Sequence, residues 1–309
     1  MTRETRTDRA PELGLVCITS SDAVRYKTIT RTRLLRLDRE EQEATLEALY
    51  RANLTRLERA VAFCRERGIG LYRLTSDFMP FSDVAAGEAA LERVAAEARR
   101  VGGLVTESGI RMVLHPDQFV VLNSDEPRVI SNSVSILEAH ARIFDLLGQP
   151  RSAWAAFNIH GGKGGRADRL VEQIGRLPDA VRSRVTFEND ERAYGSADML
   201  DVCRRAGVPM VFDAHHHVVK EGLDSYDHPS VGEALAAARE TWEPRPDWQL
   251  VHISNGREAF GDRRHSDLIT AMPESFRHAP WIEVEAKSKE LAIERLREFW
   301  PGRRPKSAA

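Results

Sequence analysis

Residues 211–217, VFDAHHH, place an aspartate and three consecutive histidines directly after an apolar run. Asp213 and His216 stand three residues apart, so one short loop can turn both side chains towards the same point. Carboxylates and imidazoles are protein ligands of divalent metal ions such as Zn²⁺ and Mn²⁺. The segment therefore indicates the beginning of a metal site.

Side chains of the same two types follow other apolar runs of the chain. The candidate ligands are His115, His160, Glu188, Asp213, His216, His252, His265 and Glu285. A single histidine at the end of a strand is more often structural than catalytic, so the interpretation depends on the whole set. The set holds no thiolate, which leaves Mn²⁺ open, and its eight ligands are too many for one ion. We therefore expect a cluster of two or three divalent ions.

The carboxylates of this set carry the strongest argument. Glu188, Asp213 and Glu285 follow runs rich in Val, Ile and Phe. Burying them together would bring like-charge repulsion and a large desolvation cost unless cations compensate. Their position in such segments therefore favours bound metal ions.

The apolar runs themselves predict β-strands that alternate with amphipathic helices. Eight strands are expected, at residues 13–17, 70–74, 110–114, 154–159, 184–188, 209–213, 249–254 and 281–285. Continuous apolar strands flanked by helices are typical of a parallel sheet, and eight strand–helix units predict an α/β protein with a single (β/α)8 TIM barrel. An open doubly wound sheet is the alternative, but the sequence lacks the Gly-rich phosphate fingerprint of that fold. Barrel enzymes place their chemistry at the carboxyl ends of the strands, where the candidate ligands fall.

Capping residues mark the ends of several helices. They predict helices over residues 38–68 and 127–148, with an acidic first turn in one and a proline at the start of the other. Ser196 is expected as the N-cap of a further helix, and Gly207 follows the end of that helix.

Composition is that of an ordinary soluble enzyme, with 42% hydrophobic and 30% charged residues in a chain of 309. We expect a tail over residues 1–12, the barrel domain over 13–300 and a basic tail over 301–309. Lysine and arginine total 45 against 47 acidic residues, so no global positive field indicates nucleic acid. Three cysteines without C-x-x-C spacing favour a reduced, cytoplasmic protein. No apolar run is long enough for a membrane span or a signal peptide.

Two loops on the predicted catalytic rim are basic. HGGKGGR (160–166) combines glycines with two cations, and NGREAFGDRRH (255–265) adds three more; RYKTITRTRLLR (25–36) follows the first strand. The candidate phosphate contacts are Lys163, Arg166, Arg257, Arg263 and Arg264. Any one charge run is more simply a solvated face, but three on one rim favour a long polyanion as substrate.

Gln118 and Phe119 follow His115 in a loop, where they place an amide and a large apolar ring. Such a pair can wedge into a duplex and fill the space left by extruded bases. The alternative is that Phe119 packs under the loop.

Clustered divalent ions suit more than one reaction. Metal ions about 3.5–4 Å apart are suited to phosphoryl chemistry, in which they activate water and stabilise the attacking and leaving oxygens. A sugar isomerase or epimerase on a TIM barrel can use the same metals. A protein that binds damaged DNA without catalysis would need the wedge and the basic loops but not the ligands.

Several short motifs occur in a fixed order: HPDQFVVLNS, NIHGG, TFEND, FDAHHH, HIS, HSD and EVEAKSKE. Together they resemble the UV damage endonuclease family over roughly residues 13–299. The resemblance implies a fold and metal arrangement similar to AP endonucleases of the endonuclease IV type, and dependence on Mn²⁺. It also implies cutting of UV-damaged double-stranded DNA immediately 5′ to the photoproduct. We expect the cut to leave a 3′-hydroxyl and a 5′-phosphate, and the protein to be a monomer.

The resemblance also implies roles for single residues. His115, His160 and Glu188 would hold one metal, and Glu188 would bridge to a second. Asp213, His252 and Glu285 would hold that second metal, and His216 and His265 the third. Glu188, Glu285 and His252 would form the catalytic centre. Gln118 and Phe119 would probe the lesion, whereas His215 and His217 match no role and would support the site from behind or belong to the loop.

The chain departs from the family pattern at several positions. Phe119 stands where a tyrosine is frequent, and Asp83 stands where a histidine ligand is common. Either Asp83 replaces that ligand or the first metal is held more loosely. Leu250 replaces a lysine two residues before His252, and Leu15 and Thr19 replace an aromatic residue and an asparagine. Lesion range could differ as a result.

Overall fold

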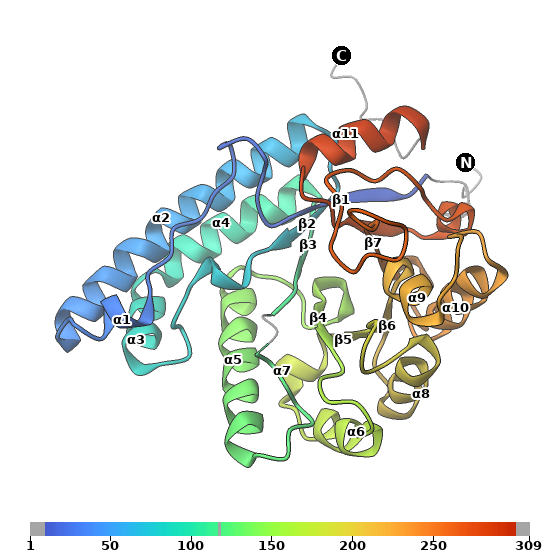
Figure 1. The fold of residues 1–309 in the computed structure, drawn as a ribbon. Helices are drawn as coiled ribbons and strands as arrows, with labels where there is room; N and C mark the ends of the chain where they lie inside the picture. The colour runs from blue at the N-terminus through green and yellow to red at the C-terminus, as the bar shows by residue number, and fades with distance from the viewer. Residues whose placement is uncertain (1–9, 117–118, 301–309) are drawn as a thin grey trace.

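Eight short parallel strands form a closed barrel in sequence order in the computed structural model, which describes residues 10–116 and 119–300 (Figure 1). The strands are β1 Glu12–Val16, β2 Leu71–Leu74, β3 Arg111–Leu114, β4 Phe157–His160, β5 Val185–Glu188, β6 Met210–Asp213, β7 Leu250–Ile253 and β8 Trp281–Val284. Hydrogen bonds between β1 and β8 close the sheet, with Gly14 opposite Glu283. The prediction of a (β/α)8 barrel is confirmed.

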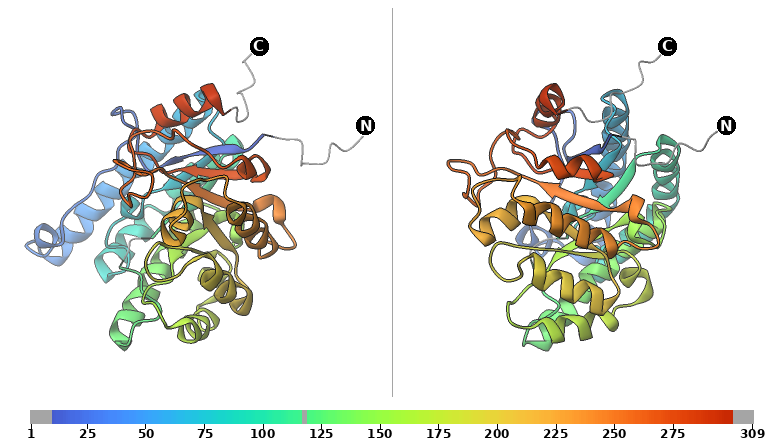
Figure 2. Two further views of the ribbon diagram at one scale, coloured as in Figure 1. Left: turned by 45° about the vertical axis from the view of Figure 1, so that its right-hand side comes forward. Right: turned by 90° about the vertical axis from the view of Figure 1, so that its right-hand side faces the viewer.

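The helices surround the strands, as the turned views make plain (Figure 2). They are α1 Arg31–Leu34, α2 Arg39–Glu66, α3 Ala85–Arg93, α4 Ala95–Ser108, α5 Pro127–Leu146, α6 Ala167–Gly175, α7 Asp179–Arg182, α8 Ser196–Ala206, α9 Ala214–Glu221, α10 Pro229–Glu240 and α11 Glu290–Phe299. Short 3-10 helices are η2 Ser76–Phe78, η3 Ala153–Ala155, η4 Pro246–Trp248 and η5 Glu274–His278. The N-terminal end of α2 extends beyond the barrel together with α1 and α3 (Figure 1).

The predicted helix ends agree with the structure to within a residue or two. Asp38 caps α2 in a capping box with Glu41, and Gly207 ends α8 with a φ of 65°. Ser196 is not the N-cap that we expected, because Gly195 holds that position. The hydroxyl of Ser196 is bound instead by His217, at 2.8 Å from Nδ1.

One strand begins later than predicted. Residues 154–159 were expected to be extended, but Ala153–Ala155 forms η3 and β4 starts at Phe157. The guanidinium of Arg111 donates hydrogen bonds to the carbonyls of Ala153 and Trp154, at 3.0 and 2.8 Å. These carbonyls are thus bound by a side chain instead of joining the strand ladder.

The barrel interior changes from apolar to polar along the strands. Successive side chains of a strand point to opposite faces, so every second residue lies inside the barrel. Leu71, Val113, Val211 and Leu250 belong to one buried apolar cluster, separate from the large core between strands and helices. Two residues further along β7, the same face carries His252. The apolar layer thus supports a polar layer at the carboxyl ends of the strands.

Two further features concern the cysteines and the apolar character of the helices. All three cysteines are free, as predicted. None of the helices described has the length and apolar character that a membrane span requires.

Candidate metal centre

Six consecutive strands bring imidazole and carboxylate groups to one end of the barrel. His115 follows β3, His160 ends β4, Glu188 ends β5, Asp213 ends β6, His252 lies in β7 and Glu285 follows β8. Three groups have ligand atoms within 4.8 Å of one another: His115 with His160 and Glu188, Glu188 with Asp213 and His216, and Asp213 with His252 and Glu285. Glu188 and Asp213 are each shared by two groups, so the three groups form one continuous cluster.

His216 takes its place through the start of α9 rather than through a loop. Asp213 is the N-cap of this helix, and its Oδ1 accepts a hydrogen bond from the backbone N–H of His216 at 2.7 Å. The ring Nδ1 of His216 then lies 3.5 Å from Glu188 Oε1. The spacing of three residues between Asp213 and His216 is therefore that of a helix cap and its first turn.

His265 lies apart from these groups. The resemblance paired it with His216, but the three groups found among the described residues do not include it. Its Nδ1 is 3.8 Å from Glu285 Oε2, and its side chain is 31% exposed. A backbone bridge between Gly256 and His265 fixes the loop that carries it.

Glu188 lies at the centre of the cluster and is fully buried. Nδ1 of His252 is 3.2 Å from Oε2 of Glu188, Nε2 of His115 is 3.5 Å from the same oxygen, and Asn158 donates a hydrogen bond to it. Burial alone would raise the pKa of Glu188, but the nearby charges of His252 and His160 lower it well below its usual range. Glu188 is therefore ionised at neutral pH.

Two charged residues of the site were missed by the sequence analysis, Arg73 on β2 and Glu283 on β8. Arg73 NH1 lies 3.2 Å from Glu283 Oε2 and also contacts Glu285. Burial would raise the pKa of Glu285, but Arg73 and His252 lower it. Bound dications are therefore not the only positive charges that can keep the acids ionised. The signal was the spacing of two residues along each strand. It puts Arg73 on the same inner face as Leu71, and Glu283 on the same inner face as Glu285.

The histidines of the cluster differ in charge. Burial lowers the pKa of His160, which favours the neutral form that coordinates metals. Burial would also lower the pKa of His216, but Asp213 and Glu188 outweigh it and raise that pKa to about 9. The pKa of His252 is raised well above its usual value, because Glu188 and Glu283 outweigh the effect of burial.

The donor set fits divalent metal ions. His160 Nδ1 and Asp213 Oδ2 are buried and have no hydrogen-bond partner among the described residues. Unpaired buried polar atoms are rare and need a ligand, an ion or water to satisfy them. Imidazole and carboxylate ligands without thiolate suit Mn²⁺ or Zn²⁺.

The remaining two histidines of the VFDAHHH segment hold α9 in place. Nδ1 and Nε2 of His215 lie 2.7 Å from the hydroxyl of Tyr226 and 2.8 Å from the carbonyl of Asp262. His217 contacts the hydroxyls of Ser196 and Ser230, at 2.8 and 3.0 Å. Of the three, His216 alone belongs to the ligand groups found among the described residues, and its two neighbours anchor the helix that carries it.

The loop after β4 is clamped by polar side chains. Asn123 accepts a hydrogen bond from the backbone N–H of Lys163 at 2.9 Å and donates to its carbonyl at 2.8 Å. The hydroxyl of Tyr194 donates to the same carbonyl at 2.9 Å. Gly162 has a φ of 76°, and a Cβ there would lie 2.5 Å from Asn123 Oδ1. The loop therefore requires glycine at this point to present its cations.

Three cations surround Asp125 beside this loop. Arg166 contacts the carboxylate directly, Arg169 lies 3.6 Å from it and Lys163 lies 3.9 Å from it. Each of the three is at least 36% exposed. One acid cannot neutralise three cations, so this part of the rim keeps a net positive charge.

The loop after β7 holds its arginines less equally. Asp262 accepts hydrogen bonds from the backbone and guanidinium of Arg264, and Glu258 lies 2.9 Å from the same guanidinium. Arg263 lies 4.0 Å from Glu191, at the limit of an ion pair, and no ion pair of Arg257 occurs among the described residues. Arg257 and Arg263 are therefore freer than Arg264 to meet a phosphate.

Phe119 projects into solvent, with 72% of its surface exposed. The alternative that it packs under its loop is therefore wrong. Gln118, its predicted companion, lies outside the described residues.

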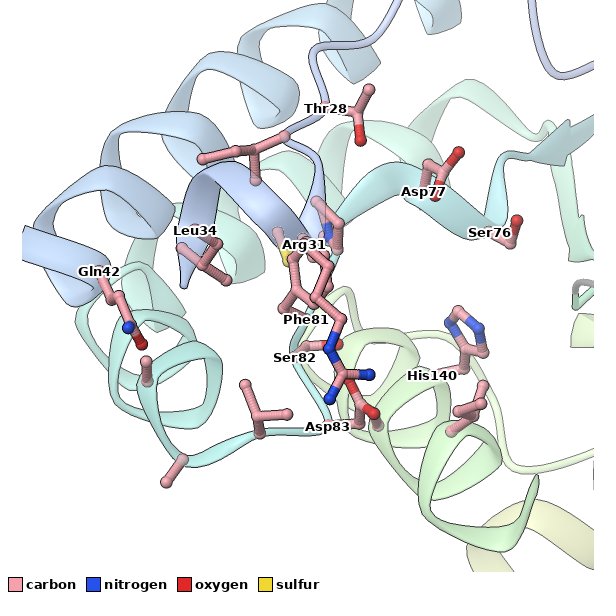
Figure 3. A pocket seen from close by; sticks show the side chains of 18 of the residues that line it. Thr28, Arg31, Leu34, Gln42, Ser76, Asp77, Phe81, Ser82, Asp83 and His140 are labelled. Atoms are coloured by element: carbon pink, nitrogen blue, oxygen red, sulfur yellow. The ribbon is translucent and has the colours of Figure 1, made fainter. Parts of the chain in front are cut away.

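A groove of about 650 Å³ runs beside Phe119, between the α1 region, residues 76–86 and α5 (Figure 3). Arg31 and Asp83 both line it, and Asp83 belongs to none of the three ligand groups found among the described residues. Asp83 thus does not replace a histidine ligand in this arrangement. The other residues that depart from the family pattern have structural contacts. Leu250 lies in the apolar layer below His252, Leu15 lies in the large core, and the hydroxyl of Thr19 accepts a hydrogen bond from the backbone N–H of Val24.

Comparison with known proteins agrees with this geometry. The chain is 52% identical over 301 residues to a UV DNA damage endonuclease of Nostoc sp., covering 97% of this chain and 93% of the relative. It is 47% identical to the UV DNA damage endonuclease of Deinococcus radiodurans, covering 95% and 97%. Among solved structures, SacUVDE matches with a TM-score of 0.76 and 25% identity, covering 93% of this chain and 98% of the other.

Endonuclease IV from Thermus thermophilus shares the fold, with a TM-score of 0.58, 17% identity and coverage of 94% and 97%. The model of the family described as UV-endonuclease UvdE matches residues 11–301. The chain is therefore a member of the UV-endonuclease UvdE family.

Proposed function

We propose that this DNA repair endonuclease nicks the phosphodiester backbone immediately 5′ to UV photoproducts such as pyrimidine dimers. The products would be a 3′-hydroxyl and a 5′-phosphate. The observation that carries the proposal is the continuous ligand cluster, in which Glu188 and Asp213 are each shared by two groups. Membership of the UvdE family and the exposed ring of Phe119 support the choice of substrate.

The cluster would hold two or three divalent ions, for which we propose Mn²⁺. The three groups of ligand atoms would each provide one position, and His265 would approach from its loop through Glu285. Such ions, when bound, activate water and stabilise charge on the attacking and leaving oxygens of a phosphate. Glu188, Glu285 and His252 would be the catalytic centre, because Nδ1 of His252 lies 3.2 Å from Glu188 and 3.4 Å from Glu285.

The DNA would be held by the two basic loops. Lys163 and Arg166 on one side, and Arg257, Arg263 and Arg264 on the other, would contact phosphates on either side of the cluster. Phosphate contacts give position rather than sequence preference. Phe119, with Gln118, would enter the duplex at the lesion. Unstacking costs a few kcal/mol and least at a damaged base, which supplies selectivity without reading sequence.

An end-labelled duplex with one pyrimidine dimer tests the proposal. With Mn²⁺, the wild-type protein is expected to give one nick immediately 5′ to the dimer, and none with chelator or on the undamaged duplex. Glu188→Gln and Glu285→Gln should abolish nicking and keep most of the binding to damaged DNA. A nick elsewhere, or retained nicking by these variants, contradicts the assignment.

The same assay separates the other candidates. A protein that only binds damage would retain the labelled duplex without cutting it. The fold is shared with D-psicose 3-epimerase, at a TM-score of 0.53 and 10% identity. An epimerase would neither retain nor cut the duplex, and a separate assay would show turnover of a ketose sugar.

A further inference from the structure

Glu283 is a carboxylate buried at the mouth of the barrel, with 1% of its surface exposed. It lies on β8, two residues before Glu285, which directly follows the strand, so both side chains project into the barrel. The ligand groups found among the described residues do not include it. Its Oε1 has no hydrogen-bond partner in the described part of the chain, whereas its Oε2 faces two charged groups. Its influence on the site therefore passes through those two neighbours.

The first neighbour is His252, which the strand register places opposite Glu283. Oε2 of Glu283 contacts Nε2 of the ring. The other ring nitrogen, Nδ1, lies 3.2 Å from Glu188 Oε2 and 3.4 Å from Glu285 Oε1. An imidazole binds a metal through one nitrogen, and an acceptor on the other N–H fixes the ring orientation and makes the ligand more basic. Glu283 Oε2 is the carboxylate oxygen in contact with Nε2, while neither ring nitrogen makes a hydrogen bond of good geometry among the described residues.

The second neighbour is Arg73. Its NH1 lies 3.2 Å from Glu283 Oε2 and also contacts Glu285. The guanidinium is thus shared by a carboxylate inside the ligand groups and one outside them. If the charge of Glu283 were removed, Arg73 would be left to pair with Glu285 alone among these two acids. Glu285 would then be less available to a metal ion.

We propose that Glu283 is a positioning residue of the metal centre. It holds His252 with Nδ1 towards Glu188 and Glu285, and it keeps Arg73 from pairing fully with Glu285. Its effect on nicking rests on the proposed endonuclease function, whereas its effect on metal binding can be measured without DNA.

Glu283→Gln tests the first consequence, because it keeps the size of the side chain and removes its charge. Titration of the purified protein with Mn²⁺, followed by electron paramagnetic resonance, is expected to show binding at least about 10-fold weaker than wild type. Asp145→Asn is the matched control, since Asp145 pairs with the buried Arg184 before β5, at the other end of that strand from Glu188. This control should bind Mn²⁺ with wild-type affinity.

Nuclear magnetic resonance of the wild-type protein, labelled with ¹⁵N at histidine and loaded with Zn²⁺, tests the ring orientation directly. His252 is expected to carry its proton on Nε2, with the signal assigned by its loss from His252→Asn. A proton on Nδ1, or unchanged Mn²⁺ affinity in Glu283→Gln, overturns the proposal. If Glu283→Gln does not fold, the wild-type spectrum still decides.

Activity separates this inference from the proposed function. Glu283→Gln should lower kcat for nicking and leave KM for damaged DNA near the wild-type value. If the wild-type protein does not nick DNA at all, the proposed function fails, while the Mn²⁺ titration and the histidine spectrum still decide the role of Glu283.

Discussion

Replacing Phe119 by alanine should reduce discrimination between damaged and intact DNA without unfolding the protein. Phe119 is 72% exposed, so its side chain makes few contacts in the free protein. We expect the free energy of unfolding to change by less than about 1 kcal/mol, as for a surface substitution. The exposed surface of the ring is therefore available for contacts with a substrate.

The magnitude of the effect follows from that surface. A phenylalanine buries roughly 150–250 Å² when fully enclosed, at about 25 cal/mol per Å². With 72% of the residue surface exposed, complete insertion into a duplex sets an upper limit of about 3–4.5 kcal/mol. Stacking of an aromatic side chain on a base is worth about 1–3 kcal/mol by alanine substitution. The preference for damaged DNA should therefore fall by roughly 5- to 150-fold.

Competition binding measures this preference. A labelled duplex with a single dimer is displaced by unlabelled damaged or intact duplex in the presence of chelator, at one fixed salt concentration, because DNA affinity depends on salt. Phe299→Ala is the control, since Phe299 is also an exposed phenylalanine, on α11. An unchanged preference in Phe119→Ala, equal to that of Phe299→Ala, would refute the wedge.

Three further outcomes are expected. Arg166→Ala should weaken binding to all DNA sequences equally and reduce the slope of log binding constant against log salt concentration by about 1. Arg264→Ala should reduce this slope less, because Asp262 and Glu258 already hold Arg264. Equal slopes for the two variants in titrations from low to high salt would contradict this. Burial would raise the pKa of Glu290, but backbone N–H groups of Ser21 and Ser20 lower it below its ordinary 4.5. Above pH 4.5, the wild type should therefore be more stable than Glu290→Gln, by about 1 kcal/mol. This advantage should be lost as the pH falls through the lowered pKa of Glu290. Denaturant unfolding at several pH values checks both expectations. Mn²⁺ at a free concentration of 100 times Kd should stabilise the folded protein by about 2.7 kcal/mol and so raise its melting temperature. Chelator should reverse this shift without unfolding the protein.

The sequence predicts the barrel well because the signal is repeated along the chain. Each apolar run is short and bounded, and all eight form strands in the expected order. The error at residues 154–156 arises from a long-range contact, since Arg111 captures the carbonyls of Ala153 and Trp154. A local pattern cannot show that a side chain some forty residues earlier competes for these groups.

In the candidate site, the residues best predicted from sequence are those whose positions are determined by the order and direction of the strands. His115, His160 and Glu188 come together because parallel strands end on one rim. Loop residues are different, because their positions depend on local contacts such as the bridge that holds His265. The exposure of Phe119 also depends on the conformation of its loop, so composition left it open.

Arg73 and Glu283 could have been found by applying the two-residue period of β-strands to residues that interrupt apolar runs. The side chain of a charged residue in a barrel strand points either outwards, towards the helices, or into the barrel. Arg73 follows Leu71 at a spacing of two, and Leu71 belongs to the interior apolar layer. The same spacing joins Glu283 to Trp281, another member of that layer.

These two residues change what the acids of the cluster imply about metal. Four carboxylates and three cationic groups lie together at the barrel mouth: Glu188, Asp213, Glu283 and Glu285 with Arg73, His216 and His252. Because the pKa values of His216 and His252 are raised, the protein can nearly balance its own charge when no metal is bound. Divalent ions, if bound, would then replace protons on His216 and His252 instead of filling an uncompensated negative site. The acids alone therefore do not require metal, and the argument for metal rests on the shared geometry of Glu188 and Asp213 and on the unpaired buried atoms of His160 and Asp213.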